Sequence, residues 1–169
     1  MEDSMYSPAL RRHLLYRAVL SRTHDLSRRH PGLFLLHGFG GDYRSWTSSV
    51  DLPHIVDTTD LVIITPDARN SWYVNSVTDS LARYEDAIVT DLLPSVVRKF
   101  HLDSTKIGIA GFSMGGFGAL SLGLHHPKQF VFIGAFSASL DVPLRIPELE
   151  RNNRGELRQS LEQAFGTDP

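Results

Sequence analysis

Residues 107–120 read IGIAGFSMGGFGAL and place one serine between two glycines, where an apolar run ends and a stretch of small residues begins. The apolar run that precedes the serine is typical of a buried β-strand, and the small residues that follow are typical of a closely packed helix. Residues 111–115, GFSMG, match the G-x-S-x-G pattern of a sharp strand-to-helix turn that exposes a nucleophilic serine. The pattern alone is common, but this context favours Ser113 as a nucleophile over an incidental serine in a glycine-rich turn.

A serine on such a turn is expected to adopt a strained backbone conformation, and the flanking glycines remove side chains that would clash. The helix after Ser113 directs its free N–H groups and the positive end of its dipole toward the same point. The backbone N–H of Met114 is therefore a predicted donor to the oxyanion of a tetrahedral intermediate.

A second donor is expected from the loop that follows the first core strand. That loop is His37-Gly38-Phe39-Gly40-Gly41, directly after the apolar run LFLL at residues 33–36. The backbone N–H of Phe39 is the predicted donor. For His37 we predict a structural role, in which its ring holds the loop by hydrogen bonds, rather than a role as a catalytic base.

The rest of the chain fits one α/β domain over residues 1–169. Of its 169 residues, 41% are hydrophobic, which is enough for a core. Four apolar runs, near residues 33–36, 61–64, 107–110 and 130–136, predict strands of a mostly parallel sheet, and residues 12–20 predict an early edge strand.

Helices are expected between and after these strands. Apolar residues from Leu81 to Phe100 keep a helical period, within which Pro94 starts a new segment or kinks the helix. Residues 115–125 predict a second helix, and Leu157, Leu161 and Phe165 form the apolar stripe of a third. This alternation predicts an α/β-hydrolase-like sheet with helices on both faces.

Composition argues against several classes of partner. A net charge of −2 with scattered charges gives no basic surface for nucleic acid. There is no cysteine, which excludes thiol catalysis, and we find no spacing typical of metal ligands, so neither a metal nor another cofactor is expected. No long apolar run and no signal-peptide pattern is present, so we predict a cytoplasmic protein with no membrane partner.

The chain resembles the esterase D / antigen 85 type of serine esterases within the α/β-hydrolase superfamily. The resemblance rests on LFLLHGFGGDYRSW (33–46), VIITPDARNSWYVN (62–75), YEDAIVTDLLPSV (84–96) and IGIAGFSMGGFGAL (107–120). It implies that Ser113 is the nucleophile and that Phe39 and Met114 form the oxyanion hole. It also implies that Asn70, Ser71 and Trp72 lie beside the acyl site and bind substrate, although an ordinary loop with a buried tryptophan remains an alternative.

The triad acid and histidine are not found where the resemblance would place them. After Ser113 the only histidines are His125 and His126, at the far end of a helix about 18 Å long. We expect them to interact with the end of that helix. Asp141 is a candidate for the acid, and the alternative is a solvated charge on a loop.

The resemblance covers about the N-terminal two-thirds of a family member and implies that the last two strands of an eight-stranded sheet are absent. Three explanations remain open: a truncated coding sequence, a second half on a separate chain, or a shortened form that dimerises. An uncovered strand edge would favour a homo-oligomer.

These observations predict a serine hydrolase that cleaves a small-molecule carboxylic ester or thioester through an acyl-serine intermediate. Two alternatives are an acyltransferase of the same fold and a catalytically impaired scaffold that lacks the triad acid and histidine. The sequence contains no feature that identifies the ester.

Overall fold

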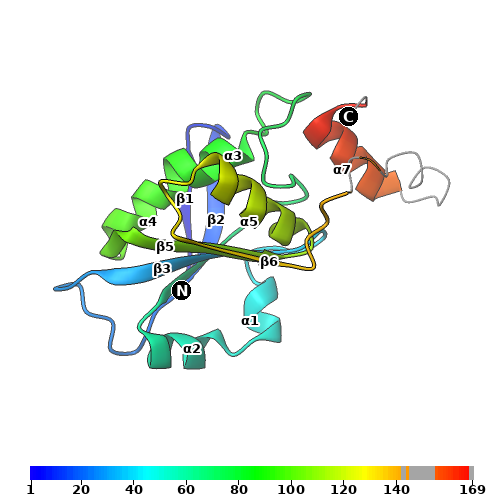
Figure 1. The fold of residues 1–169 in the computed structure, drawn as a ribbon. Coiled ribbons are helices and arrows are strands. Elements are labelled where there is room, and N and C mark those ends of the chain that lie inside the picture. The colour runs from blue at the N-terminus through cyan, green and yellow to red at the C-terminus, as the bar shows by residue number, and fades with distance from the viewer. Residues whose placement is uncertain (142–143, 145–154, 168–169) are drawn as a thin grey trace.

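The computed structural model describes residues 1–141, 144 and 155–167, and its centre is one six-stranded sheet (Figure 1). The strand order is β1-β2-β4-β3-β5-β6. The bounds are Glu2–Ser7 for β1, Arg12–Val19 for β2, His30–Leu36 for β3, Val62–Pro66 for β4, Leu102–Phe112 for β5 and Phe132–Phe136 for β6.

The four later strands form the parallel part of this sheet. β3 pairs in parallel with both β4 and β5, and β5 pairs in parallel with β6. β1 and β2 join as antiparallel strands beyond β4. The predicted mostly parallel sheet is therefore confirmed, and the buried apolar runs of β3, β4 and β5 are the reason for it.

Helices cover both faces of the sheet (Figure 1). On one face lie α1 (Ser45–Ser49) and α2 (Leu52–Thr59), and α2 buries Leu52 and Val56 against the sheet. On the other lie α3 (Tyr84–Asp86), the π-helical segment η1 (Ala87–Leu92), α4 (Leu93–Lys99) and α5 (Met114–His125). The last helix, α7 (Gly155–Phe165), lies beyond the end of α5 where Ser113 sits.

The helix expected from Leu81 onward starts later and changes its hydrogen-bond pattern. Leu81 is 49% exposed and precedes the helix, so its inclusion in the apolar stripe was wrong. The other predicted stripe positions, which are Tyr84, Ile88, Leu92, Val96 and Phe100, are buried. Pro94 stands in the first turn of α4, directly after the π-helical segment, and its missing N–H explains why the pattern changes there.

Two other predictions need correction. Residues 12–20 were expected at a sheet edge, but β2 lies inside the sheet because the polar segment β1 pairs with it. α1 and α2 were not predicted, because the polar and β-branched residues from Ser45 to Thr59 show no long helical period. The helix predicted at the C-terminal end is confirmed as α7, in which Leu161 is fully buried.

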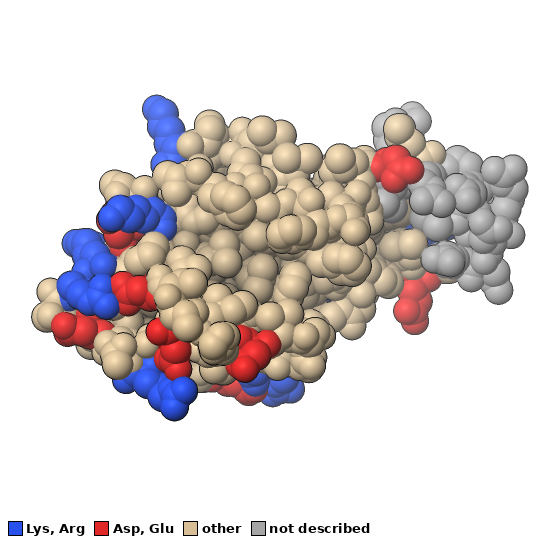
Figure 2. Space-filling view, turned by 60° about the horizontal axis from the view of Figure 1, so that its bottom comes forward, with Lys and Arg blue, Asp and Glu red and all other residues tan. Residues whose placement is uncertain are grey.

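β6 is the outermost strand on its side of the sheet and exposes apolar side chains. Phe132 and Phe136 are each more than half exposed, as are Val131 and Leu140 next to the strand. Figure 2 shows most of the charged side chains on this face at one end and along its lower rim, acidic side chains also at the other end, and a broad uncharged area between them. In the described part of the chain, no helix has the length and apolar character needed to span a bilayer.

Candidate active site

Ser113 occupies the junction of β5 and α5 in a backbone conformation that few residues adopt. Its φ is 56° and its ψ is −117°, so this non-glycine residue has the positive φ that the sequence predicts for the turn. The Ser113 amide donates to the carbonyl of Phe136 on β6, and its carbonyl accepts from the amide of Phe117. Ser113 is partly exposed, so it is not a core residue.

Close backbone contact holds this turn against the end of β3. A Cβ atom on Gly115 would lie 2.3 Å from the carbonyl oxygen of Leu36 and 2.6 Å from that of His37. A Cβ atom on Gly111 would lie 2.2 Å from the carbonyl oxygen of Gly115. Glycine at both positions therefore lets the start of α5 approach the loop that follows β3.

His37 holds that loop in place. Its Nδ1–H donates to the carbonyl of Gly38 at 2.8 Å, and its Nε2 accepts from the amide of Ala68 at 3.1 Å. The carbonyl of His37 accepts from the buried hydroxyl of Tyr73 at 2.9 Å. Both ring nitrogens are engaged, so the predicted structural role of His37 is confirmed and it is not available as a base for Ser113.

Burial lowers the pKa of His37 below its ordinary value of 6.5, since the ring is only 1% exposed. The unfolded chain therefore binds more protons than the folded chain below pH 6.5. It follows that the free energy of unfolding falls as the pH drops through this window, by up to about 1.4 kcal/mol per pH unit for this one group.

We expect His37→Gln to be less stable than wild type at pH 7.5 and to lose less further stability between pH 6.5 and pH 5. Urea unfolding at several pH values measures both slopes. His24, whose pKa burial also lowers, and the carboxylates with a lowered pKa are the same in both proteins, so the difference between the two slopes belongs to His37. Equal slopes in the two proteins would contradict the assignment of a buried neutral imidazole.

The loop after β3 lies directly against the turn at Ser113. A methyl group on Gly38 would lie 3.6 Å from Ser113 Cβ, so residues 37–41 are immediate neighbours of the serine. Within the described residues, neither the Phe39 amide nor the Met114 amide donates a hydrogen bond. Met114 is the first residue of α5, where free N–H groups and the positive end of the dipole coincide. This arrangement is suited to an anionic oxygen beside Ser113.

The segment after β4 supports the same loop. Asn70 Oδ1 accepts a hydrogen bond from the amide of Gly40 at 2.8 Å, and Ser71 Oγ accepts one from the amide of Tyr73. Trp72 is 1% exposed, and its Nε1–H donates to Ser160 Oγ on α7 at 3.1 Å. The structure therefore places Asn70 at the loop and Ser71 beside it, but buries the Trp72 side chain.

No histidine among residues 1–141, 144 and 155–167 contacts the Ser113 hydroxyl. Its side-chain hydrogen-bond partner there is Ser139, with the two Oγ atoms 3.5 Å apart. His126 and His125 lie at the far end of α5, where their rings are 2.8 and 3.4 Å from a carboxylate oxygen of Glu85. Asp141 is exposed in the segment after β6.

Three contacts at this site were not predicted from the sequence, and each joins segments far apart in the chain. They are the contact between Ser139 and Ser113, the hydrogen bond from Gly40 to Asn70, and the hydrogen bond from Tyr73 to the His37 carbonyl. No local spacing signals these pairings. In the described part of the chain, no group of three or more His, Asp or Glu side chains is placed to hold a metal ion.

The family model described as "Putative esterase" matches residues 7–160. Among curated proteins, an acetyl esterase of Caldicellulosiruptor saccharolyticus is 29% identical over 110 residues, which are 64% of this chain and 41% of that protein. The diacylglycerol acyltransferase/mycolyltransferase Ag85A of Mycobacterium tuberculosis is 27% identical over 121 residues, which are 66% of this chain and 36% of that protein.

Solved structures show the same fold. The fluorophosphonate-binding serine hydrolase F of Staphylococcus aureus superposes with a TM-score of 0.83 at 22% identity, over 99% of this chain and 65% of that one. A ferulic acid esterase superposes with a TM-score of 0.73 at 26% identity, over 82% of this chain and 58% of that one. The matched part of this chain spans about two fifths of the length of the curated relatives.

Proposed function

The chain belongs to the esterase family whose model matches residues 7–160, and on that basis we propose that it is a serine hydrolase that cleaves carboxylic esters or thioesters. The observation that carries this proposal is the positive φ of Ser113 between β5 and α5, beside the loop that contains Phe39. Within the described residues, the amides of Phe39 and Met114 donate no hydrogen bond. Strain at one residue persists where the surrounding structure requires it, as in a nucleophile turn.

In the proposed reaction, Ser113 Oγ attacks the carbonyl carbon of the ester. The amides of Phe39 and Met114 bind the oxygen as it becomes negative. The bond to the leaving alcohol or thiol then breaks, and the serine proton passes through a base to that leaving group. Water next attacks the acyl-serine and releases the acid. Among the described residues no histidine contacts the Ser113 hydroxyl to act as that base, and Asp141 is the candidate that the sequence offers for its acidic partner.

The test is the release of 4-nitrophenol from 4-nitrophenyl butyrate in the first turnover. Formation of an acyl-serine predicts a rapid burst that approaches one equivalent of nitrophenol per chain, followed by a slower rate set by hydrolysis. A linear time course without a burst, at the rate of an equal concentration of heat-unfolded chain, would contradict the proposal.

An acyltransferase is the second candidate, and the match to the mycobacterial acyltransferase supports it. In that case an alcohol rather than water accepts the acyl group from Ser113. Addition of an acceptor alcohol should then accelerate the phase after the burst and give a new ester, whereas a hydrolase gives the free acid. A scaffold without catalysis would give neither product.

We also propose that the outer edge of β6 pairs with a second copy of the chain. This edge has no strand partner among the described residues, and Phe132 and Phe136 expose apolar surface beside it. Light scattering tests the proposal, because a mass of 18.9 kDa at micromolar concentration would exclude the pairing.

A further inference from the structure

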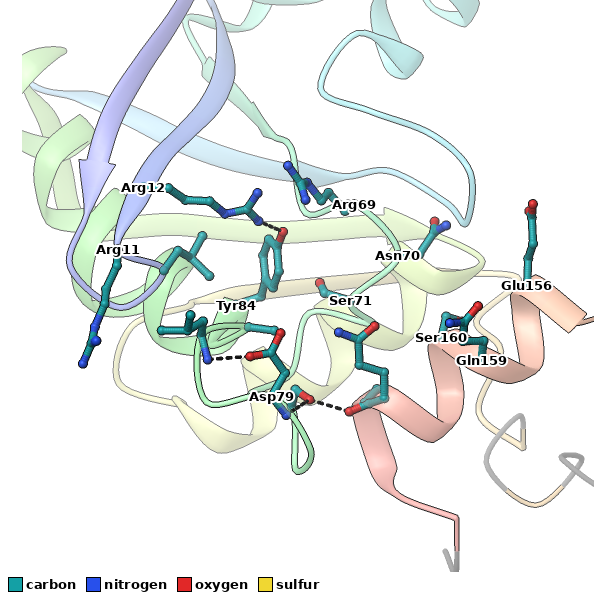
Figure 3. Close-up of a pocket in the computed structure, with 16 residues that line it drawn as sticks. Arg11, Arg12, Arg69, Asn70, Ser71, Asp79, Tyr84, Glu156, Gln159 and Ser160 are labelled. Carbon is teal, nitrogen blue, oxygen red and sulfur yellow. Dashed lines mark hydrogen bonds between the residues drawn. The ribbon is translucent and has the colours of Figure 1, made fainter.

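A cavity of about 810 Å³ lies between the β1–β2 turn, the segment after β4 and helix α7. The side chains that line it include Arg11, Arg12, Arg69 and Tyr84 (Figure 3). Asn70 and Ser71, from the segment after β4, also line it. Its two lining carboxylates are Asp79, which accepts from the amide of Leu81, and Glu156 at the start of α7. The lining therefore carries one more positive than negative charge.

Arg12 and Arg69 approach the hydroxyl end of Tyr84, whereas Arg11 points away from it (Figure 3). Within the described residues, none of these three arginines forms an ion pair. Arg12 donates to the Tyr84 hydroxyl and also lies over its ring, 5.6 Å from the centroid. Asp67 acts electrostatically on Tyr84 together with Arg12 and Arg69, but within the described residues it forms no ion pair with either arginine. The two guanidinium groups repel each other, so an anion between them would stabilise the arrangement.

Tyr84 adds a third donor at the same place. Its side chain is only 3% exposed, and burial raises its pKa, so the phenol keeps its proton at neutral pH. The hydroxyl accepts from Arg12, but its own O–H has no acceptor among the described residues. A buried donor without an acceptor is costly, which suggests that a ligand accepts from it.

We propose that Arg12, Arg69 and Tyr84 bind the anionic end of the substrate, a carboxylate or phosphate distant from the ester bond that Ser113 attacks. This inference rests on the proposed esterase function. Asn70 links the two places, because it follows Arg69, lines the cavity and accepts from Gly40 in the loop that carries Phe39. Across the sheet, β2, which begins with Arg12, lies three strand spacings from β5, and β4, which Arg69 follows, lies two. These spacings correspond to about 14 Å and about 10 Å from the strand that ends directly before the serine.

Calorimetric titration of the Ser113→Ala protein with suberate, an eight-carbon dicarboxylate, tests the site. This variant cannot form the acyl-serine, so the titration measures binding alone. Adding Arg69→Gln should weaken suberate binding at least about tenfold, because it removes a charged hydrogen bond. Arg98→Gln removes the same charge from the exposed face of α4 and should leave the affinity unchanged. No binding, or equal binding in all three proteins, would overturn the proposal.

Kinetics then distinguish a substrate end from a site for free anions. The ratio of kcat/KM for mono-4-nitrophenyl suberate to that for 4-nitrophenyl octanoate should fall about tenfold in Arg69→Gln and stay constant in Arg98→Gln. An unchanged ratio, or inorganic phosphate binding as tightly as suberate with the same dependence on Arg69, would overturn the assignment to substrate. If neither ester is cleaved, the esterase function fails, while the calorimetric result still decides whether the anion site exists.

Discussion

Ser113→Ala is expected to abolish the burst of 4-nitrophenol and to reduce steady turnover of 4-nitrophenyl butyrate to the level of the unfolded chain. The variant has no oxygen to form the acyl intermediate, although both amides of the loop and turn remain. Loss of the serine from a complete catalytic triad costs up to about 2 × 10⁶-fold in kcat. A smaller loss is expected if no base serves Ser113, since the wild-type rate is then already low.

The fold should survive this change, because no described hydrogen bond depends on the Ser113 hydroxyl except its 3.5 Å contact with Ser139. Ser139→Ala is the matched control, since it removes the other hydroxyl of that pair and leaves the nucleophile. It should keep the burst. A burst of equal size in Ser113→Ala would show that another residue forms the acyl intermediate.

Gly115→Ala is expected to destabilise the protein by about 3 kcal/mol or more. The added methyl carbon would lie 2.3 Å from the carbonyl oxygen of Leu36, and this oxygen belongs to the backbone of a central strand that has little freedom to move. Overpacking of a core typically costs about 1–3 kcal/mol, and a collision between backbone groups lies at or above the upper end. Urea unfolding and a fall in Tm of about 6–12 °C would measure the effect.

Gly155→Ala is the matched control for this glycine substitution. Gly155 is the first residue of α7, and a Cβ atom there would meet no heavy atom of the described residues within 4 Å. Alanine is the better helix former, so this variant should be as stable as wild type or slightly more stable. If Gly115→Ala unfolded at the same urea concentration as Gly155→Ala, the close approach of α5 to the loop after β3 would be wrong.

The strands that could be predicted from the sequence are those with continuous apolar runs. β3, β4 and β5 are buried on both faces, so each appears in the sequence as a short run of neighbouring apolar residues that can be recognised without knowing the rest of the fold. β1, by contrast, is a polar segment whose pairing with β2 depends on residues up to 15 positions away. α1 and α2 are short and show no long helical period of apolar residues, so they were not predicted either.

The candidate site divides in the same way. Closely spaced glycines predict both the turn at Ser113 and the loop at Phe39, and the structure places these two segments side by side. The contacts that fix the loop, from Asn70 and Tyr73, join residues 30 and 36 positions apart and have no local pattern. The cavity lined by Arg12 and Arg69 could not be predicted from a local pattern either, because its residues come from the β1–β2 turn, the segment after β4 and α7.

The central claim is that a reactive serine stands at residue 113, and covalent labelling with a fluorophosphonate probe tests it most directly. Mass spectrometry of the digested, labelled protein should find one adduct per chain, on the peptide that contains Ser113. The Ser113→Ala variant should carry none under the same conditions. A folded wild-type chain that remains unlabelled, or an adduct on a different residue, would contradict the account.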